Sequence, residues 1–391
     1  MATRSIVIVG AGVSGLTTAL ELRARGWRVT VLDQGAVPHP DAASTDISKV
    51  VRMDYGADEL YTEMAERALA RWDLWNALWE RPLFHRTGFL ILTRENEMPA
   101  GGFEQASFAL QTKRGHPLER IGRAGLAARF PAWNAARYGD GYFNPNAGWA
   151  ESGAVVTKLA QLCHAHGAVI HEHVPFASFI DSGTKIVGVR TQDGTEHRAD
   201  NVLLTVGAWT PFLLPETRPL LRVTGHAVLH LQPKDPAPFR AEVFPVWAAD
   251  IANTGRYGFP VNAAGLVKFA KHGKGTEIHD PAQPRIVSEE DIKEGREFLR
   301  ESIPSLAAAP LAGMRQCWYG DSVDGDFLID HHPERAGLVV VGGDSGHGFK
   351  FAPVLGALIA DVVEQKPHHG AERFHWRQPR AGLEASRAPR A

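Results

Sequence analysis

The first residues of the chain alternate between short apolar runs and a helical pattern. Residues 5–9 (SIVIV) and 28–32 (RVTVL) are apolar runs rich in β-branched side chains, which is typical of strands buried in a parallel sheet. Between them, residues 16–25 have apolar positions at helical spacing, and Gly26 ends that pattern. The N-terminal pattern therefore predicts a strand–helix–strand unit.

After this unit, the alternation of predicted strands and helices is interrupted once and then resumes near the C-terminus. Helices are predicted at residues 57–81, 153–166 and 352–364. Strands are predicted at residues 88–92, 169–180, 185–190, 196–205, 223–231, 256–260, 265–270 and 338–341, with a turn at Asp193-Gly194. Residues 219–317 are rich in strands without intervening helices, which indicates a second domain.

This order of elements predicts an α/β fold, which becomes α+β when the whole chain is considered. We expect a discontinuous Rossmann-type domain and a second domain built on a mainly antiparallel sheet. The expected ranges are 1–85, 148–218 and 318–391 for the first domain, and 86–147 and 219–317 for the second.

Three glycines follow the first predicted strand in the pattern GxGxxG. Gly10 suits a tight turn, Gly12 lets a pyrophosphate approach the backbone, and Gly15 lets the helix pack closely on the strand. Asp33 lies eighteen residues after Gly15 and ends the second predicted strand, where a carboxylate can accept hydrogen bonds from a ribose. Strand, helix and acid together predict a dinucleotide site, without choosing between NAD and FAD.

Composition narrows the possible functions. The net charge is −2 and no basic block occurs, so we expect no nucleic-acid partner. No run of eighteen apolar residues occurs, so we expect no membrane partner. The two cysteines, Cys163 and Cys317, exclude a disulfide scaffold and favour a reducing, cytoplasmic location, with Cys163 as a buried, inert thiol. The histidines and cysteines show no metal-binding spacing, so no metal is expected.

Residues 343–346 (GDSG) match the string around the nucleophilic serine of trypsin-like proteases. A serine of that kind needs an all-β scaffold with an upstream histidine and aspartate, whereas this chain is α/β, so Ser345 is not expected to be a nucleophile. The stretch instead joins a predicted strand to a predicted helix, and we expect its amides to approach a cofactor. The predicted nucleotide-binding fold begins at residue 5 and is completed by a strand that starts at residue 338. This arrangement is more similar to FAD enzymes than to NAD dehydrogenases.

Five stretches together resemble the D-amino-acid-oxidase-type flavoprotein superfamily, and within it the monomeric sarcosine oxidase, fructosyl-amine oxidase (amadoriase) and pipecolate oxidase group. The stretches are GAGVSG with Asp33, residues 48–56, residues 257–260 with 267–273, residues 317–330, and residues 345–351. The resemblance implies a monomeric enzyme that contains FAD. It implies oxidation of a secondary amine, an N-substituted or cyclic amino acid, to an imine, with O2 as acceptor and H2O2 released.

The resemblance also implies roles for single residues. Cys317 falls on the cysteine that holds the flavin through a thioether, and Lys268 falls on the lysine that promotes the reaction with O2. Arg52 and Lys350 fall on the pair that grips the substrate carboxylate. Tyr257, Tyr319 and His272 map near the substrate. The expected cofactor contacts are Gly10, Gly12, Val13, Ser14, Gly15, Asp33, Gln34, Ser48, Lys49, Val174, Gly207, Trp209, Cys317, Asp344, Gly346, Gly348, Phe349 and Lys350.

Departures from the family pattern leave the substrate open. Sarcosine oxidases carry arginine at the position of Lys49 and histidine at that of Thr45, which disfavours sarcosine itself. Trp247 either walls the pocket or belongs to a core. A dehydrogenase that passes electrons to another acceptor stays an alternative, as does a biosynthetic oxidase whose imine is trapped in ring formation. A binding subunit without turnover is disfavoured, because the residues expected to do chemistry are all present.

Overall fold

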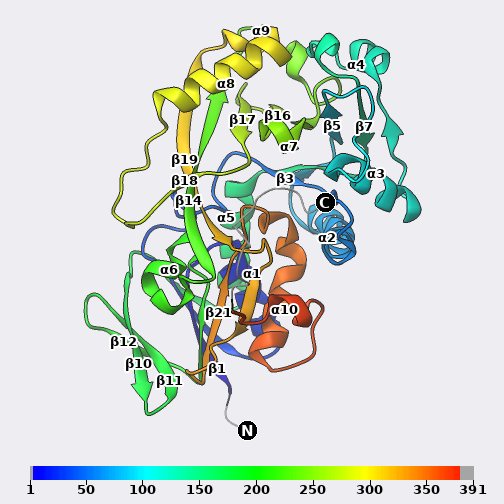
Figure 1. The fold of residues 1–391 in the computed structure, drawn as a ribbon. Coiled ribbons are helices and arrows are strands. Elements are labelled where there is room, and N and C mark those ends of the chain that lie inside the picture. The colour runs from blue at the N-terminus through cyan, green and yellow to red at the C-terminus, as the bar shows by residue number, and fades with distance from the viewer. Residues whose placement is uncertain (1–2, 379–391) are drawn as a thin grey trace.

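The computed structural model describes residues 3–378, and these form four β-sheets with helices packed against them (Figure 1). The first sheet has six strands, all parallel except its first two, which pair antiparallel. Its order is β20 (Leu328–His331), β21 (Leu338–Gly342), β13 (Asn201–Leu204), β1 (Ser5–Val9), β2 (Arg28–Leu32) and β9 (Val169–His171). The predicted strand–helix–strand unit is β1, α1 (Val13–Ala24) and β2.

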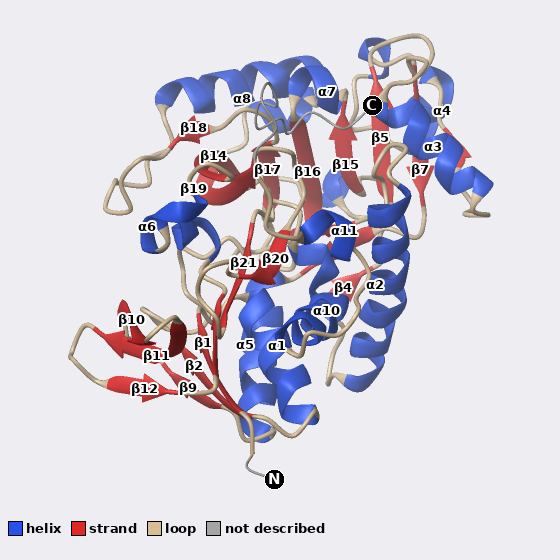
Figure 2. Cartoon of the chain, turned by 60° about the horizontal axis from the view of Figure 1, so that its bottom comes forward, coloured by secondary structure: helices blue, strands red, loops and turns tan. Residues whose placement is uncertain are grey.

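Helices cover one face of this sheet and a small sheet covers the other. Figure 2 shows α5 (Ser152–Ala165), α1, α10 (Ala352–Val363) and α2 (Glu59–Leu78) side by side. The small sheet contains β10 (Phe176–Ser182), β11 (Lys185–Thr191) and β12 (Glu196–Arg198). Ile6 and Ile8 pack against the helices, whereas Val7 and Val9 pack toward the small sheet. Because both faces are covered, the strand is an unbroken apolar run.

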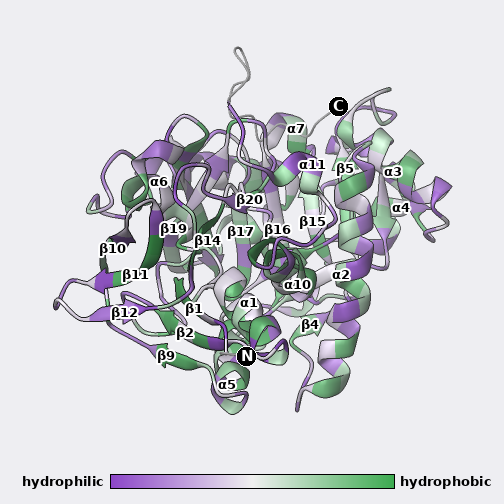
Figure 3. Ribbon diagram, turned by 90° about the horizontal axis from the view of Figure 1, so that it is seen from below, coloured by the Kyte–Doolittle hydropathy of each residue, from purple (hydrophilic) through white to green (hydrophobic). Residues whose placement is uncertain are grey.

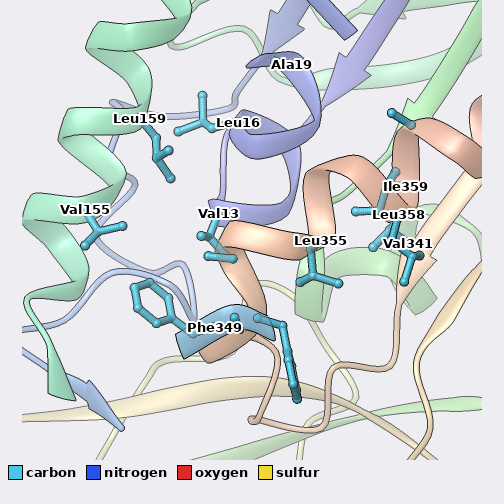
Figure 4. Close-up of a cluster of buried hydrophobic side chains, with 14 of the residues drawn as sticks. Val13, Leu16, Ala19, Val155, Leu159, Val341, Phe349, Leu355, Leu358 and Ile359 are labelled. Atoms are coloured by element: carbon cyan, nitrogen blue, oxygen red, sulfur yellow. The ribbon is translucent and has the colours of Figure 1, made fainter. Parts of the chain in front are cut away.

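The helical layer forms the largest apolar core. Figure 4 shows side chains of α1, α5 and α10 meeting there, among them Leu16, Leu159 and Ile359. Cys163 is buried in this core, where burial raises the pKa of its thiol to about 12, as expected for an inert cysteine. The longer helix α2 is amphipathic, and its polar and apolar positions alternate as purple and green bands in Figure 3.

The second large sheet has nine strands and is mainly antiparallel, with one parallel pair, β15–β5. Its strands are β18 (Thr276–Glu277), β14 (Leu221–Leu231), β17 (Val267–Lys271), β16 (Arg256–Val261), β15 (Val246–Ala249), β5 (Phe89–Thr93), β7 (Asp140–Asn144) and β6 (Glu119–Arg120), and β19 (Leu311–Ser322) pairs with β14. The two large sheets confirm the predicted fold class. The division into residue ranges stays a prediction, and its boundary at 317/318 falls within β19.

Helices and turns complete the second region. They are α3 (Phe103–Lys113), α4 (Arg123–Arg129), α7 (Ile251–Thr254), α8 (Glu289–Ser302) and α9 (Pro304–Ala307). Trp247 is fully buried, and its ring stacks with Phe298 at a centroid distance of 5.9 Å and with Phe269 at 6.1 Å. The interpretation of Trp247 as a pocket wall is therefore wrong, since its side chain belongs to the core under α8.

Two predicted strands are each split in the structure. The strand predicted at 169–180 divides into β9 and β10, because Pro175 interrupts it and His173 has a φ of 57°. The strand predicted at 196–205 divides into β12 and β13 at Asp200, whose carboxylate accepts from the backbone N–H and hydroxyl of Ser5, both at 2.8 Å. At each break the chain passes between the six-stranded sheet and the small sheet.

A short sheet lies between the two larger ones and leads into the candidate site. It consists of β3 (Lys49–Val51), β8 (Gly148–Ala150) and β4 (Phe84–His85), in the order β3-β8-β4. Between residues 3 and 378, no helix combines the length and the apolar character that crossing a membrane requires. Within the same range, no cluster of three or more histidine, cysteine or acidic side chains has a geometry suited to a metal ion.

Candidate functional site

A cavity of about 420 Å³ lies at the carboxyl ends of β1, β2, β13 and β21. This edge of a parallel sheet is where nucleotide ligands bind in doubly wound folds. The predicted cofactor residues that line it are Gly10, Gly12, Val13, Ser14, Asp33, Gln34, Val174, Gly207, Trp209, Asp344 and Gly348. Residues from the start, the middle and the end of the chain therefore meet around one cavity.

The glycines of the first turn have the geometry that the motif predicts. Gly10 has a φ of +104°, and a Cβ there would lie 2.5 Å from the carbonyl oxygen of Thr205. A Cβ on Gly15 would lie 2.0 Å from the carbonyl oxygen of Gly10, so this glycine serves the packing of α1 on the turn. Gly15 itself does not line the cavity. Gly12 is the N-cap of α1 and lacks a side-chain cap, so the positive end of the helix faces the cavity.

Asp33 joins two loops at the rim of the cavity. Its Oδ2 accepts from the N–H of Ala11 at 2.8 Å and its Oδ1 accepts from the N–H of Gly35 at 3.0 Å. Burial raises the pKa of Asp33, and the two backbone donors act in the opposite direction. Each carboxylate oxygen keeps a second lone pair for a ribose hydroxyl. The residues present therefore fit a dinucleotide, with pyrophosphate at the helix end and ribose at Asp33.

Some cavity residues were missed from the sequence. His39 and residues 42–44 line it from the loop after β2, and Pro281 and Ala282 line it from the loop before α8. The ring of His39 lies 5.8 Å from that of Trp209, in an edge-to-face arrangement. Neither loop carries a motif, so no signal in the sequence identifies these residues.

Other predicted cofactor residues do not line this cavity. These are Gly15, Ser48, Lys49, Cys317, Gly346, Phe349 and Lys350. The side chain of Phe349 lies in the helical core (Figure 4), with its ring 6.0 Å from that of Trp72. Its ring packs between α2 and α10, and a cofactor contact by Phe349 stays a prediction.

Cys317 lies next to the cavity. It is fully buried on β19 and packs in a cluster with Tyr319, Tyr257 and Ala43. Ala43 also lines the cavity, so the cluster and the cavity share a wall. Lys49 places its Nζ 5.9 Å from the ring centroid of Tyr319.

Lys268 is buried on β17 and paired with a carboxylate. Its Nζ lies 2.5 Å from Oδ2 of Asp46 and 2.6 Å from the carbonyl oxygen of Ser48. The Nζ also lies 4.8 Å from the ring centroid of Phe259, which in turn contacts Tyr257. Burial lowers the pKa of Lys268 to about 8, while Asp46 acts to raise it. The alternative that Lys268 is a solvated surface lysine is therefore wrong.

Arg52 and Lys350 meet at one tyrosine. Lys350 donates to the hydroxyl of Tyr55 at 2.9 Å and to the carbonyl oxygen of His347 at 2.8 Å. The guanidinium of Arg52 lies 5.0 Å from the centroid of the Tyr55 ring, and its Nη1 is buried without a hydrogen-bond partner. Burial, together with the charge of Arg52, lowers the pKa of Lys350 well below its usual range. The charges of Asp344 and Asp54 act in the opposite direction and raise the pKa of Lys350.

His347 extends this network and was missed from the sequence. Its Nε2 lies 3.2 Å from the carbonyl oxygen of Gly325, which assigns the ring proton to Nε2. Its Nδ1 therefore accepts from the hydroxyl of Tyr55, at 3.2 Å. Burial lowers the pKa of His347 well below its usual range, with Lys350 acting in the same direction, so the imidazole is neutral. Tyr55 and His347 each belong to one of the five stretches that carry the resemblance, and that was the only signal for them.

The remaining predicted residues lie around these groups. Tyr257 and Tyr319 are in the Cys317 cluster, and His272 is close enough to His347 for its charge to act on that ring. Ser345 is buried, and its hydroxyl accepts from the N–H of Ser322 at 3.1 Å and donates to the carbonyl of Gly343 at 3.2 Å. The serine is thus held by the backbone, as expected for a structural residue.

The chain is similar to known proteins along most of its length. The family model described as FAD dependent oxidoreductase (DAO) matches residues 5–362. N-methyl-L-tryptophan oxidase from Citrobacter koseri is 29% identical over 365 residues, covering 92% of this chain and 95% of that protein. The enzyme of the same name from Yersinia pestis is 30% identical, covering 93% and 95%. The structure is similar to fructosamine oxidase (Amadoriase II) from Aspergillus fumigatus in complex with FSA, with a TM-score of 0.84, 27% identity, and coverage of 96% of this chain and 90% of that one.

Proposed function

The chain belongs to the DAO family of FAD dependent oxidoreductases, and from this premise we propose that it oxidises a secondary amine, an N-substituted α-amino acid, to an imine. The CH–NH unit of the substrate loses two electrons and two protons, and O2 takes up both to give H2O2. Hydrolysis of the imine then releases the carbonyl compound and the shortened amine.

The pair of buried cations is the observation that carries this proposal. Arg52 and Lys350 both lie against Tyr55, and the charge of Arg52 helps to lower the pKa of Lys350 more than either Asp344 or Asp54 raises it. Two neighbouring cations repel each other, and burial adds to the cost of their charge, so a ligand that brings a carboxylate is favoured beside them. A guanidinium offers a bidentate fork and an ammonium offers a point charge, which together orient an α-carboxylate.

The cofactor would be held by groups already in place. The N–H groups at the start of α1 would hold the pyrophosphate and Asp33 the ribose, and we propose that Cys317, beside the cavity, attaches the flavin covalently. When bound, FAD supplies the two-electron acceptor for the oxidation. The protein contributes the position of the substrate and the electrostatic field around it.

The same cations would prepare the amine for oxidation. The amine must be neutral, because its lone pair drives cleavage of the C–H bond. A buried site beside Arg52 and Lys350 disfavours an ammonium through desolvation and like-charge repulsion. His347 adds no positive charge, because burial lowers its pKa and its Nδ1 is occupied by Tyr55. The chain's residues thus favour the reactive form of the substrate without a dedicated general base.

We propose an N-methyl α-amino acid with an aromatic side chain as the substrate class. Two relatives are named for N-methyl-L-tryptophan, and a structural neighbour is a fructosamine oxidase. Besides Tyr55, the rings of Phe103 and Phe89 lie 5.7 Å and 5.9 Å from the guanidinium of Arg52. Rings beside the carboxylate anchor offer apolar surface and stacking to an aromatic substrate.

The test is a set of anaerobic reductions. The yellow protein is mixed without O2 with N-methyl-L-tryptophan, sarcosine, pipecolate and a fructosyl amino acid, and bleaching of the flavin absorbance is followed. We expect N-methyl-L-tryptophan to bleach the flavin and L-tryptophan, its primary-amine counterpart, to bleach it far more slowly. Flavin that stays oxidised with all of the amines would contradict the proposed function. On return of air, H2O2 should appear in a one-to-one ratio with imine.

Replacement of Cys317 by Ala should release the flavin on acid precipitation, because the proposed thioether can no longer form. The measurement is the flavin absorbance in the acid supernatant compared with the pellet. The matched control is Cys163→Ala, since Cys163 is also fully buried but lies in the helical core with its Sγ 3.4 Å from the carbonyl oxygen of Leu16. Flavin that stays with the precipitated Cys317→Ala chain would show that the attachment site is elsewhere.

A further inference from the structure

Asp46 forms a buried ion pair with Lys268, across 222 positions of the sequence. It lies in the loop that leads into β3, whereas Lys268 is on β17. Each of the two side chains is 1% exposed. The main chain of Asp46 is fixed as well, because its carbonyl oxygen accepts from the N–H of Gly153 at 2.9 Å and from the hydroxyl of Ser152 at 2.8 Å. The start of α5 thus fixes the main chain of Asp46, whose side chain pairs with Lys268.

The surroundings of this pair are mostly cationic. Lys49 and Arg315 act on Asp46 through their charge, and His230 places its Nε2 3.3 Å from Oδ1 of Asp46. Lys49 and Cys317 act on Lys268, and its ammonium lies 4.8 Å from the ring centroid of Phe259. Asp46 is the one carboxylate among the charged groups named here as acting on Lys268. Its own pKa lies well below the usual range despite burial, with Lys268 as the largest favourable influence, so it is ionised.

We propose that Asp46 is the positioning residue for the step with O2: it holds the ammonium of Lys268 in one place and keeps it protonated. The inference rests on the proposed role of Lys268 as the cation that stabilises negative charge developing on O2. A fixed charge in a dry site stabilises such a charge without reorganising. A lysine that is neutral, or that swings between partners, loses this effect.

The chemistry of buried lysines explains why a carboxylate is needed. Burial is the largest influence on Lys268 and lowers its pKa to about 8, even with Asp46 acting in the opposite direction. Without the carboxylate, the folded-state pKa falls further, and the ammonium loses its proton at a lower pH. Lys268 is charged below its folded-state pKa and neutral above it. The loss of Asp46 should therefore matter most above pH 7 and least below pH 6.

The test compares Asp46→Asn with the wild-type protein across pH 6 to 9. The flavin is reduced by light in the absence of O2, so that the oxygen step is measured without any amine. We expect the reoxidation rate constant of Asp46→Asn to be lower by about fivefold or more at pH 8, since Lys268 with a pKa of about 8 is half protonated there and a fall of one further unit leaves about a tenth protonated. The deficit should shrink toward pH 6. A deficit that is equal at every pH, or no deficit, would overturn the proposal.

Two further variants separate charge from structure. Asp46→Glu keeps the carboxylate and should recover part of the rate at pH 8. Lys268→Met has no ammonium to titrate, so its rate should not vary with pH, and its deficit against the wild type should shrink as pH rises through the pKa of Lys268, about 8. Thermal unfolding gives a readout that does not depend on turnover. Asp46→Asn leaves Lys268 unpaired, so adding Lys268→Met should raise the melting temperature of Asp46→Asn. A further fall in the double variant would overturn the proposed coupling. Failure of every amine to bleach the flavin would affect only the proposed function.

Discussion

Replacement of Lys268 by Met should slow reoxidation of the reduced protein by O2 by about two to three orders of magnitude, the range seen when one preorganised stabilising group is removed. Anaerobic reduction by the amine should change far less, because the carboxylate anchor at Arg52 and Lys350 is intact. Stopped-flow absorbance measures the two half-reactions separately. Met preserves the length and apolar character of the side chain, so the buried site is not left with a cavity.

A second lysine on the same strand provides the control. Lys271 is on β17 but is 39% exposed in its side chain, pairs with Glu294 at 2.7 Å and does not line the cavity. Lys271→Met should leave both half-reactions near the wild-type rates. Equal slowing of reduction and reoxidation in Lys268→Met would reject the oxygen role and point to general damage of the site.

Replacement of Arg52 by Met should lower kcat/KM for an N-methyl amino acid by about two to three orders of magnitude. Loss of one partner from a buried, hydrogen-bonded charge pair costs about 2–5 kcal/mol, and each 1.4 kcal/mol is a factor of ten. Arg52→Lys should recover only part of this, because an ammonium has no planar fork to match a carboxylate. Steady-state kinetics with N-methyl-L-tryptophan is the measurement.

The complementary experiment removes the carboxylate from the substrate instead of the arginine from the protein. N-methyltryptamine lacks the carboxylate, so the wild-type protein should oxidise it as poorly as Arg52→Met oxidises the amino acid. The variant should then show little further loss with N-methyltryptamine, because the interaction has already been removed. Arg86→Met, at an exposed arginine that pairs with Asp73, is the control for loss of an arginine. Unchanged discrimination between the two substrates in Arg52→Met would contradict the carboxylate role.

The N-terminal unit was predictable because its pattern is local. An unbroken apolar run followed by glycines specifies β1 and the start of α1, and the helices α5 and α10 lie within a residue of the expected ranges. Family membership, which the five stretches predicted, is confirmed by the comparisons. The splits at Pro175 and Asp200 were missed, since apolar content continues through both and only the change of sheet reveals them.

Other elements were missed although a signal existed. The helix α8 begins with a reciprocal capping box between Ser288 and Asp291, a pattern that is visible in the sequence. The contacts of Asp46 with Lys268 and of His347 with Tyr55 had no such signal, because each joins segments far apart in the chain. Sequence motifs could identify the expected cationic residues of the site, such as Lys268. Partners such as Asp46 could be identified only from the three-dimensional structure, in which distant segments lie side by side.

The order of the six-stranded sheet also sets when the cofactor can be captured during biosynthesis. β1 and β2 leave the ribosome first, but β13 must fill the place beside β1 before β21 can join the sheet. The wall formed by residues 341–344, 348 and 355 is thus the last part of the cavity to be synthesised. A nascent or truncated chain that ends before this segment offers only the first half of the nucleotide site. Flavin retained by the chain therefore reports that synthesis has reached its C-terminal segment and that the two ends of the protein have docked.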